Sequence, residues 1–261
     1  MPLHYHQATA DLLRQPLVPS PAALKLLEER EAACGITLPA SLREWYSLED
    51  AVDILARHSN DDHPVPLALL GQIAPLETDP GLHVAGRLLV MRENQSVCSW
   101  VVQLDGSDDP PVLVGMDDDT AADGEPPVVW RPYAETFSTF VYNWVWDWPS
   151  GDVCSVWGSD DPLAAEDLAY LRASFPEGPP TYHWPGDCTY RFGTPAARII
   201  IWDEPSRQAD WTLISESADT LVGLLRLVWR CGNMPSTLDE RGDDCGAEVL
   251  ERVFRELSFG Q

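Results

Sequence analysis

LKLLEEREAACGITLPASLREWYSLED, residues Leu24–Asp50, is the stretch of sequence on which the fold prediction depends. Ser20, just before it, can cap a helix that begins at Pro21, because a serine oxygen at this position accepts a hydrogen bond from the first helical turn. Gly35 can end the same helix, since glycine adopts the left-handed conformation common at helix ends. The segment therefore predicts a helix over residues 21–34.

Apolar residues recur at helical spacing on both sides of Gly35. In the first helix Leu24, Leu27 and Cys34 fall near one face. A second helix begins at Pro39, and its predicted apolar stripe consists of Leu42, Trp45 and Tyr46. The block thus predicts two short amphipathic helices joined by a tight link.

The string Gly-Ile-Thr-Leu-Pro-Ala-Ser-Leu-Arg-Glu-Trp-Tyr-Ser-Leu, residues 35–48, resembles the opening helices of the Smi1/Knr4 (SUKH) superfamily, which is dominated by bacterial toxin-immunity proteins. The resemblance covers roughly the first 150 residues. Further segments resemble the strands and the closing helix of that family: Ser59–Leu67, Leu88–Met91, Glu93–Trp100, Asp108–Val112, Trp130–Ala134, and a helix through Phe137, Phe140, Val141 and Trp144. Many members carry a glycine-rich turn after the second helix, but none is present here, so we expect that helix to continue to about Arg57.

The resemblance implies an α+β fold in which N-terminal helices pack on a mostly antiparallel sheet. A turn signal at Pro149–Asp152 suggests a boundary, which gives a domain over residues 1–150 and a C-terminal β/α extension or second domain over residues 151–261. The alternative is that the second part adds its strands to the same sheet.

The second part is predicted to alternate helices and strands. The predicted helices are Pro162–Ser174, a helix capped by Ser217 with Leu221, Leu224, Leu225 and Val228 inward, and Ala247–Leu257; the predicted strands are Thr189–Phe192, Ala197–Asp203 and Trp211–Ser215, with Glu204–Asp210 as a hairpin connection. Ala134-Glu135-Thr136-Phe137 recurs as Ala218-Asp219-Thr220-Leu221 at an offset of 84 (218 − 134). Either a unit is duplicated, or both segments show the acidic first turn that many helices share.

Composition points to a folded, soluble chain of 261 residues with 44% hydrophobic content. Residues 1–15 have neither a basic flank nor a long apolar run, and no later stretch has the apolar length of a membrane span. We therefore expect a cytoplasmic protein. The six cysteines form no Cys-x-x-Cys pair, so all six are predicted to be reduced thiols and no metal or other cofactor is expected.

The formal charge of −25 opposes binding to phosphate backbones and favours a basic protein partner. Acidic residues gather in predicted loops, and we expect these to form the partner-binding surface: Asp105, Asp108, Asp109, Asp117, Asp118, Asp119, Asp160 and Asp161. The alternative for each cluster is a solvated surface that serves solubility.

The segment His58-Ser59-Asn60-Asp61-Asp62-His63 is the one cluster with the residue types of a metal site. Its histidines are five residues apart, which does not place them on one helical face. A polar loop whose side chains bond their own backbone is the simpler interpretation. The chain has no Gly-x-Ser-x-Gly elbow and no phosphate-binding glycine loop, so no catalytic residues are predicted.

The resemblance and the charge together predict a non-catalytic protein-binding module, an immunity protein that neutralises a cognate, basic, nuclease-like toxin. A general interaction scaffold of the Smi1/Knr4 type is the second interpretation. An enzyme that uses the His58–His63 loop is the third. Neither nucleic acid nor membrane is expected as a partner.

Overall fold

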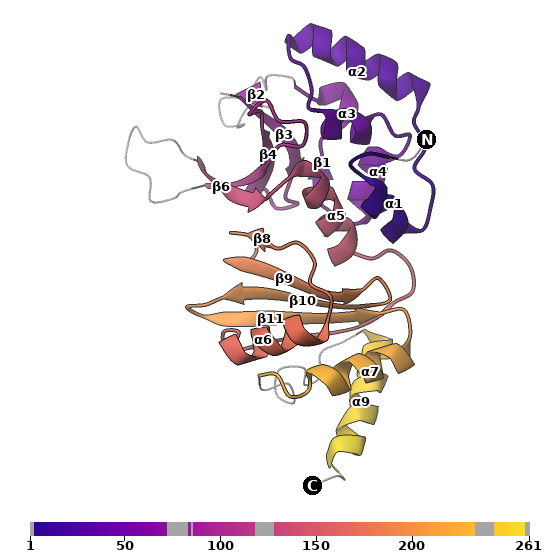
Figure 1. Cartoon of the computed structure of the whole chain (residues 1–261), viewed down its shortest axis with the longest axis vertical. Coiled ribbons are helices and arrows are strands. Elements are labelled where there is room, and N and C mark those ends of the chain that lie inside the picture. Colours follow the sequence, from indigo (N-terminus) through magenta and orange to yellow (C-terminus); the bar gives the residue numbers. More distant parts are fainter. Residues whose placement is uncertain (1–2, 72–82, 85, 118–127, 233–242, 259–261) are drawn as a thin grey trace. The chain divides into compact units, whose positions relative to one another are not determined.

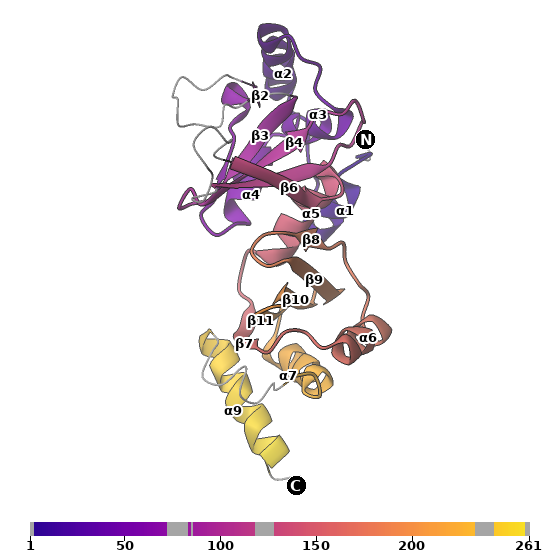
Figure 2. The ribbon, with the colours of Figure 1, turned by 90° about the vertical axis from the view of Figure 1, so that its left-hand side faces the viewer.

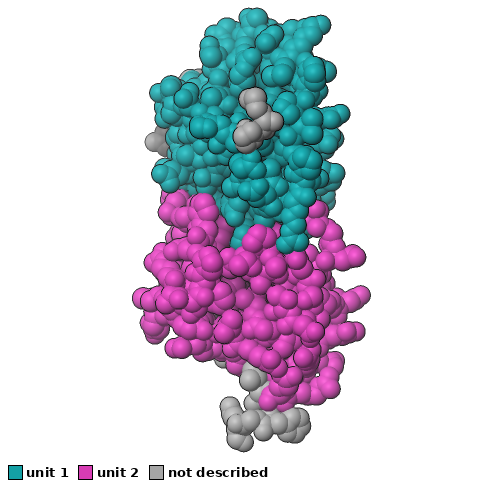
Figure 3. All heavy atoms as spheres, turned by 45° about the vertical axis from the view of Figure 1, so that its right-hand side comes forward, with its two compact units in different colours: residues 1–149 teal, residues 150–261 magenta. Residues whose placement is uncertain are grey.

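The computed structural model of the chain describes residues 3–71, 83–84, 86–117, 128–232 and 243–258 (Figure 1). Two compact units divide it, residues 1–149 and residues 150–261, which Figure 3 draws in different colours. Helices and antiparallel sheets occur in both units, so the fold class is α+β, as predicted. The two sheets have no strand in common, which excludes the alternative of one extended sheet within the described residues.

The first unit contains a helical N-terminal part, an antiparallel sheet and a closing helix. Its helices are α1 (Gln7–Leu13), α2 (Pro21–Cys34), α3 (Ala40–Tyr46), α4 (Ala51–Arg57), the short 3-10 helix η1 (Leu67–Leu69) and α5 (Phe137–Asp147). Its strands are β1 (His63–Pro64), β2 (His83–Val84), β3 (Arg87–Arg92), β4 (Cys98–Gln103), β5 (Val112–Asp117) and β6 (Val128–Ala134). They are ordered β1-β3-β4-β5-β6, with β2 beside β3.

The caps of α2 are those that the sequence predicts. The Ser20 hydroxyl accepts a hydrogen bond from the Ala23 backbone N–H at 3.3 Å, and Gly35 ends the helix with a φ of 63°. Leu27 is fully buried, but Leu24 is 37% exposed. The buried face of α2 is therefore narrower than the spacing of its apolar residues predicted.

The second predicted helix ends earlier than expected. Leu42, Trp45 and Tyr46 are buried on α3, as predicted, but the helix stops at Tyr46. Residues 47–50 form a turn, because the backbone N–H groups at Ser47 and Leu48 bond back into the last turn of α3, and α4 then begins at Ala51. The expectation of one continuous helix to Arg57 is wrong, although α4 does end at that residue.

Aromatic side chains fill the core between α5 and the sheet of the first unit. Trp100 on β4 makes edge-on contacts with Tyr133 on β6 and with Trp144 on α5, at ring-centroid distances of 5.8 and 5.2 Å. Phe140 lies among the same rings and is fully buried. This cluster fixes α5 against β4 and β6.

The second unit has one antiparallel sheet with helices packed on it (Figure 2). Its strands are β7 (Cys154–Asp160), β8 (Thr181–Tyr182), β9 (Cys188–Thr194), β10 (Ala197–Glu204) and β11 (Gln208–Ser215), in the order β7-β11-β10-β9-β8. Its helices are α6 (Ala165–Ser174), α7 (Ala218–Val228) and α9 (Asp244–Ser258). The strand β7 was not predicted, and the β10–β11 connection is only residues 205–207, shorter than the predicted hairpin.

Strand pairing aligns the core of the second unit in rows across the sheet. Val156, Leu213, Ile199 and Phe192 pair directly across β7, β11, β10 and β9, and all four are fully buried. The helix α7 packs on this sheet and α9 packs on α7 and β7. Leu221, Leu224, Leu225 and Val228 of α7 are buried in the same core, as their spacing predicted.

The repeat seen in the sequence does not match the helix starts. Thr136 caps α5 by accepting a hydrogen bond from Thr139 N–H, and Ser217 caps α7 by accepting one from Thr220 N–H. The two capping residues are 81 residues apart (217 − 136). The sequence match pairs residues that are 84 apart, so the residues it pairs lie nearly one helical turn apart when the two helix starts are aligned. The matching residues reflect a shared capping pattern placed at different helical positions.

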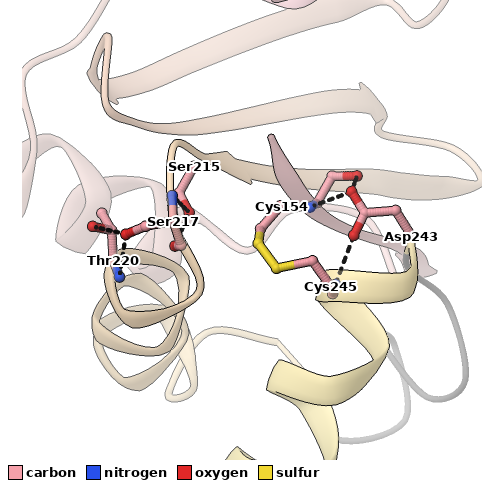
Figure 4. The surroundings of a disulfide bond; sticks show 8 residues. Cys154, Ser215, Ser217, Thr220, Asp243 and Cys245 are labelled. Carbon is pink, nitrogen blue, oxygen red and sulfur yellow. Dashed lines mark hydrogen bonds between the residues drawn. A yellow bond between two sulfur atoms is a disulfide. The ribbon is translucent and has the colours of Figure 1, made fainter. Parts of the chain in front are cut away.

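Two cysteines are bonded to each other. A disulfide joins Cys154, the first residue of β7, to Cys245 in the first turn of α9, with their Cα atoms 5.2 Å apart (Figure 4). Free thiols are present at Cys34, Cys98, Cys188 and Cys231. The prediction of six thiols is wrong for Cys154 and Cys245, because the fold brings together residues 91 apart in sequence.

None of the described helices combines the length with the apolar composition of a membrane span.

Candidate functional site

The acidic loop between β4 and β5 is the best-defined part of the predicted partner-binding surface. Asp105 and Asp108 are exposed, and Asp109 is half-buried. The Asp105 carboxylate accepts a hydrogen bond from the Ser107 backbone N–H at 2.9 Å, and the bonds from Ser107 lower the pKa of this carboxyl. Asp105 therefore stays ionised at neutral pH.

Two contacts fix this loop to neighbouring helices. The Asp109 carboxylate accepts hydrogen bonds from the backbone N–H and the hydroxyl of Ser138, in the first turn of α5. The Asp108 backbone carbonyl accepts one from Ser41 N–H, in the first turn of α3, at 2.9 Å. The Asp109 side chain thus holds the loop against α5. The backbone of Asp108 is held against α3, while Asp108 itself remains exposed to solvent.

Glu44 on α3 adds another carboxylate to this surface. Its two oxygens accept hydrogen bonds from the backbone N–H groups of His4, Tyr5 and His6, at 2.7, 2.8 and 2.9 Å. The pKa of Tyr5 is raised, first by burial and then by the negative charges of Asp108, Asp109 and Glu44. The carboxylates of Asp108, Asp109 and Glu44 therefore all lie close enough to Tyr5 to raise the pKa of its hydroxyl. We call these three residues, together with the exposed Asp105 of the same loop, the acidic patch.

Sequence reasoning missed Glu44, because this residue lies inside the helical block that predicts the scaffold. The sequence did indicate Glu44 by its position between the apolar residues Leu42, Trp45 and Tyr46. A polar side chain at that position points away from the buried face of the helix.

The other predicted acidic residues are not part of this patch as far as the structure describes them. Asp117 is the last residue of β5, and Asp118 and Asp119 lie outside the described residues. Asp160 and Asp161 belong to the second unit, at the end of β7, where the Asp160 carboxylate accepts a hydrogen bond from Asp161 N–H. The predicted site is therefore several separate acidic surfaces.

A shallow groove of about 510 Å³ adjoins the N-terminal segment that Glu44 holds. It is lined along α1 by apolar and polar side chains, among them Leu3, Gln7, Asp11, Arg14 and Leu17. Gln7 is tied in place, since its side-chain amide donates to the Asp11 carboxylate at 2.8 Å. A groove of this kind can accept a side chain of a partner protein beside the acidic patch.

The His58–His63 loop is a structural turn. The backbone N–H of Asp62 donates to the Ser59 hydroxyl, and the Asn94 backbone N–H donates to the Asp62 carboxylate at 3.0 Å. His58 is buried with Nδ1 against the Trp148 carbonyl, whereas His63 is exposed on β1. Within the described residues, no group of three or more His, Cys, Asp or Glu side chains is arranged to hold a metal ion.

Two buried carboxylates adjoin this loop. Asp62 is 5% and Glu93 is 8% exposed. Burial raises the pKa of Asp62 to about 6; the hydrogen bond from Asn94 opposes that rise, and the charge of Glu93 adds to it. Glu93 accepts hydrogen bonds from the Gln95 and Val97 N–H groups and so shapes the β3–β4 turn.

No protein-family model matches the chain, and no curated protein or solved structure is significantly similar to it. Fold and surface together define an acidic α+β protein of two compact units. The resemblance to the Smi1/Knr4 superfamily therefore rests only on the residues quoted above.

Proposed function

We propose that this chain is a protein-binding module that binds and neutralises a basic partner, a cognate bacterial toxin, without catalysing a reaction. The observation that carries the proposal is the acidic patch, in which Asp105 and Asp108 are exposed on a loop fixed to α3 and α5. A fixed loop loses little conformational freedom when a partner binds it. The resemblance of residues 35–48 to the SUKH immunity proteins supports the same function.

Charge gives this patch a physical role in association. The chain carries a formal charge of −25, so a basic partner is attracted over distances comparable to the Debye length, about 8–10 Å at physiological salt. Such steering raises the association rate more than it raises affinity. Residence time would then depend on apolar contacts, for which the groove along α1 is a candidate.

Coexpression tests the function itself. Cells that express the toxin encoded beside this gene should survive when this chain is coexpressed, and the two purified proteins should bind one to one. Survival without binding, or no binding to any neighbouring product, would contradict the proposal. Capture of several unrelated partners would favour the scaffold function instead.

The double variant Asp105→Asn/Asp108→Asn tests the acidic patch. We expect the association rate with the toxin to fall roughly three- to tenfold at low salt, because two steering charges are lost while the loop hydrogen bonds of the backbone remain. Stopped-flow fluorescence at two salt concentrations measures this change, which should shrink at high salt.

Asp187→Asn/Glu166→Gln is the matched control. It removes the same charge from exposed positions of the second unit, outside the acidic patch. An equal loss of rate in both double variants would show that only net charge matters, and the patch would have no specific role.

We also propose that the protein acts in the cytoplasm. The supporting observation is that four of the six cysteines are free thiols, which is usual where the surroundings are reducing.

A further inference from the structure

Most edge strands of the two sheets are protected against pairing with another chain. At the edges of the first sheet, β1 is two residues long and includes Pro64, and β6 carries the exposed residues Arg131 and Pro132. At one edge of the second sheet, β8 is two residues long and directly follows Pro180. Short strands, proline and charged side chains are the features by which natural sheets prevent edge pairing.

The opposite edge of the second sheet, β7, lacks these features. It is seven residues long, CSVWGSD, with no proline and no basic residue, and within the described chain it pairs only with β11. Figure 2 shows β7 at the margin of the sheet, beside β11. Its central residues Ser155–Ser159 are uncharged. Among the described edge strands, β7 is thus the one suited to accept a further strand.

Hydrogen bonds near the disulfide show which backbone groups of β7 point outward. Ser155 N–H donates to the Asp243 carboxylate at 2.9 Å, and Asp243 N–H donates to the Ser155 carbonyl at 3.2 Å. Both backbone groups of Ser155 therefore point away from β11. Because this direction alternates along an antiparallel strand, Trp157 and Ser159 also present their N–H and C=O groups outward. Asp243 covers the outer edge of β7 at Ser155.

The side chains at this edge suit a peptide with an apolar centre and basic ends. Trp157 is 42% exposed, although tryptophan is usually well buried. Acidic pairs lie at both ends of the open edge, Asp160-Asp161 after Ser159 and Asp243-Asp244 beside Ser155. The Ser159 hydroxyl also contacts Asp210 on β11.

We propose that β7 binds an extended segment of a basic partner protein, which adds to the second sheet as a new strand along Trp157 and Ser159. Backbone hydrogen bonds would supply affinity, Trp157 would pack on an apolar side chain, and the acidic pairs would select basic flanks. The proposal rests on the proposed function, to which it adds a docking mode and a second contact surface. A second copy of this chain fits less well, because it would bring like-charged strand ends together.

A synthetic peptide tests this mode directly. The probe has alternating valine and threonine residues with a pair of arginines at each end, and the control peptide has glutamates in place of the arginines. We expect the full-length chain to bind the arginine peptide at least tenfold more tightly in calorimetry. Amide hydrogen exchange should slow at Trp157 and Ser159 on binding, because their N–H groups become hydrogen-bonded. Equal binding of both peptides, or protection elsewhere only, would overturn the proposal.

Ser159→Pro and Ser159→Ala form a matched pair of variants. Proline removes the outward N–H but leaves the β7–β11 hydrogen bonds, whereas alanine keeps the N–H and removes only the hydroxyl. We expect Ser159→Pro to weaken peptide binding at least tenfold and Ser159→Ala to change it less than threefold. Retained exchange protection at Val156 confirms that β7 is folded. Equal affinity of the two variants would overturn the proposal, as would dimerisation of the chain through β7 in sedimentation experiments.

These results separate the docking mode from the proposed function. If coexpression protects cells but the peptide does not bind β7, strand addition fails and neutralisation stands. If the peptide binds as expected but no toxin is found, the β7 site stands and its partner belongs to another class.

Discussion

Asp62 is a residue whose buried carboxyl should make the folding stability depend on pH. It was predicted as part of a polar loop, and its backbone N–H does bond the Ser59 hydroxyl in such a turn. Its carboxyl, however, is buried beside that of Glu93. Neighbouring buried carboxyl groups cannot both be ionised without a cost in free energy.

The sign of this effect follows from the pKa of Asp62, which burial raises to about 6 in the folded chain from an ordinary value near 4 in the unfolded chain. The folded state binds the proton more tightly, so this group favours folding below about pH 4. Its contribution is lost as pH rises from 4 through 6. The full difference is about 3 kcal/mol at 1.36 kcal/mol for each unit of pKa.

Asp62→Asn should therefore stabilise the protein at pH 8 by about 1–3 kcal/mol and have little effect at pH 4. The amide keeps an oxygen that can accept the hydrogen bond from Asn94 N–H, so the turn is preserved. Urea unfolding at both pH values measures the difference between variant and parent. Asp53→Asn, at an exposed position on α4, is the control, and an equal gain in that variant would contradict the assignment.

At the scale of elements, the close contact between α9 and β7 depends on Gly246. A Cβ atom at this position would lie 1.9 Å from the Ser155 carbonyl oxygen, and Gly246 N–H donates to the Asp243 carboxylate at 2.6 Å. This approach is also what brings Cys245 to Cys154. Only glycine lets the first turn of α9 lie this close to the strand.

Gly246→Ala should lower the free energy of unfolding by about 2 kcal/mol or more, because the helix start must move away from β7. Gly223→Ala is the matched control: this glycine is inside α7 with no atom within 4 Å of the added Cβ, so its helix should gain about 0.5–1 kcal/mol. Thermal unfolding of both variants measures the two effects. The same sign in both would contradict the close packing of α9 on β7.

Elements with local signals were predicted well from sequence. The helices α2 and α7 begin at the predicted caps Ser20 and Ser217, because a cap and an apolar stripe lie within one short segment. The strand β7 was missed, although Val156 and Gly158 are buried between the outward residues Ser155, Trp157 and Ser159. Glycine is depleted in strands and serine is not among the residues enriched in them, so this alternation gave a weak pattern.

At the scale of the whole molecule, contacts between distant segments limit what the sequence can show. The acidic loop Asp105–Asp109 was predicted from its composition, but its attachment to α3 and α5 through Ser41 and Ser138 required the fold. The Cys154–Cys245 bond had no local signal either. A pair of cysteines 91 residues apart becomes recognisable only when the strand and the helix that carry them are placed together.

The disulfide also provides a test of the proposed compartment. Cytoplasmic thiols are normally kept reduced, so a chain that acts in the cytoplasm would have this bond opened, and both Cys154 and Cys245 would be alkylated when it is trapped from living cells with acid and labelled under denaturing conditions. Mass spectrometry reads the labelled residues, with Cys188, a free thiol, as the internal control. An unlabelled, bonded pair in these cells would place the protein in an oxidising compartment.

The same covalent bond determines how the chain responds to force. With Cys154 and Cys245 joined, the segment between them forms a closed loop that cannot be pulled straight from the ends of the chain. At 3.3–3.6 Å for each extended residue, the 91-residue separation corresponds to about 300–330 Å of length that force cannot release until the bond is reduced. A protease or a translocation channel that threads a single extended strand would meet a doubled chain at β7 and would be arrested there.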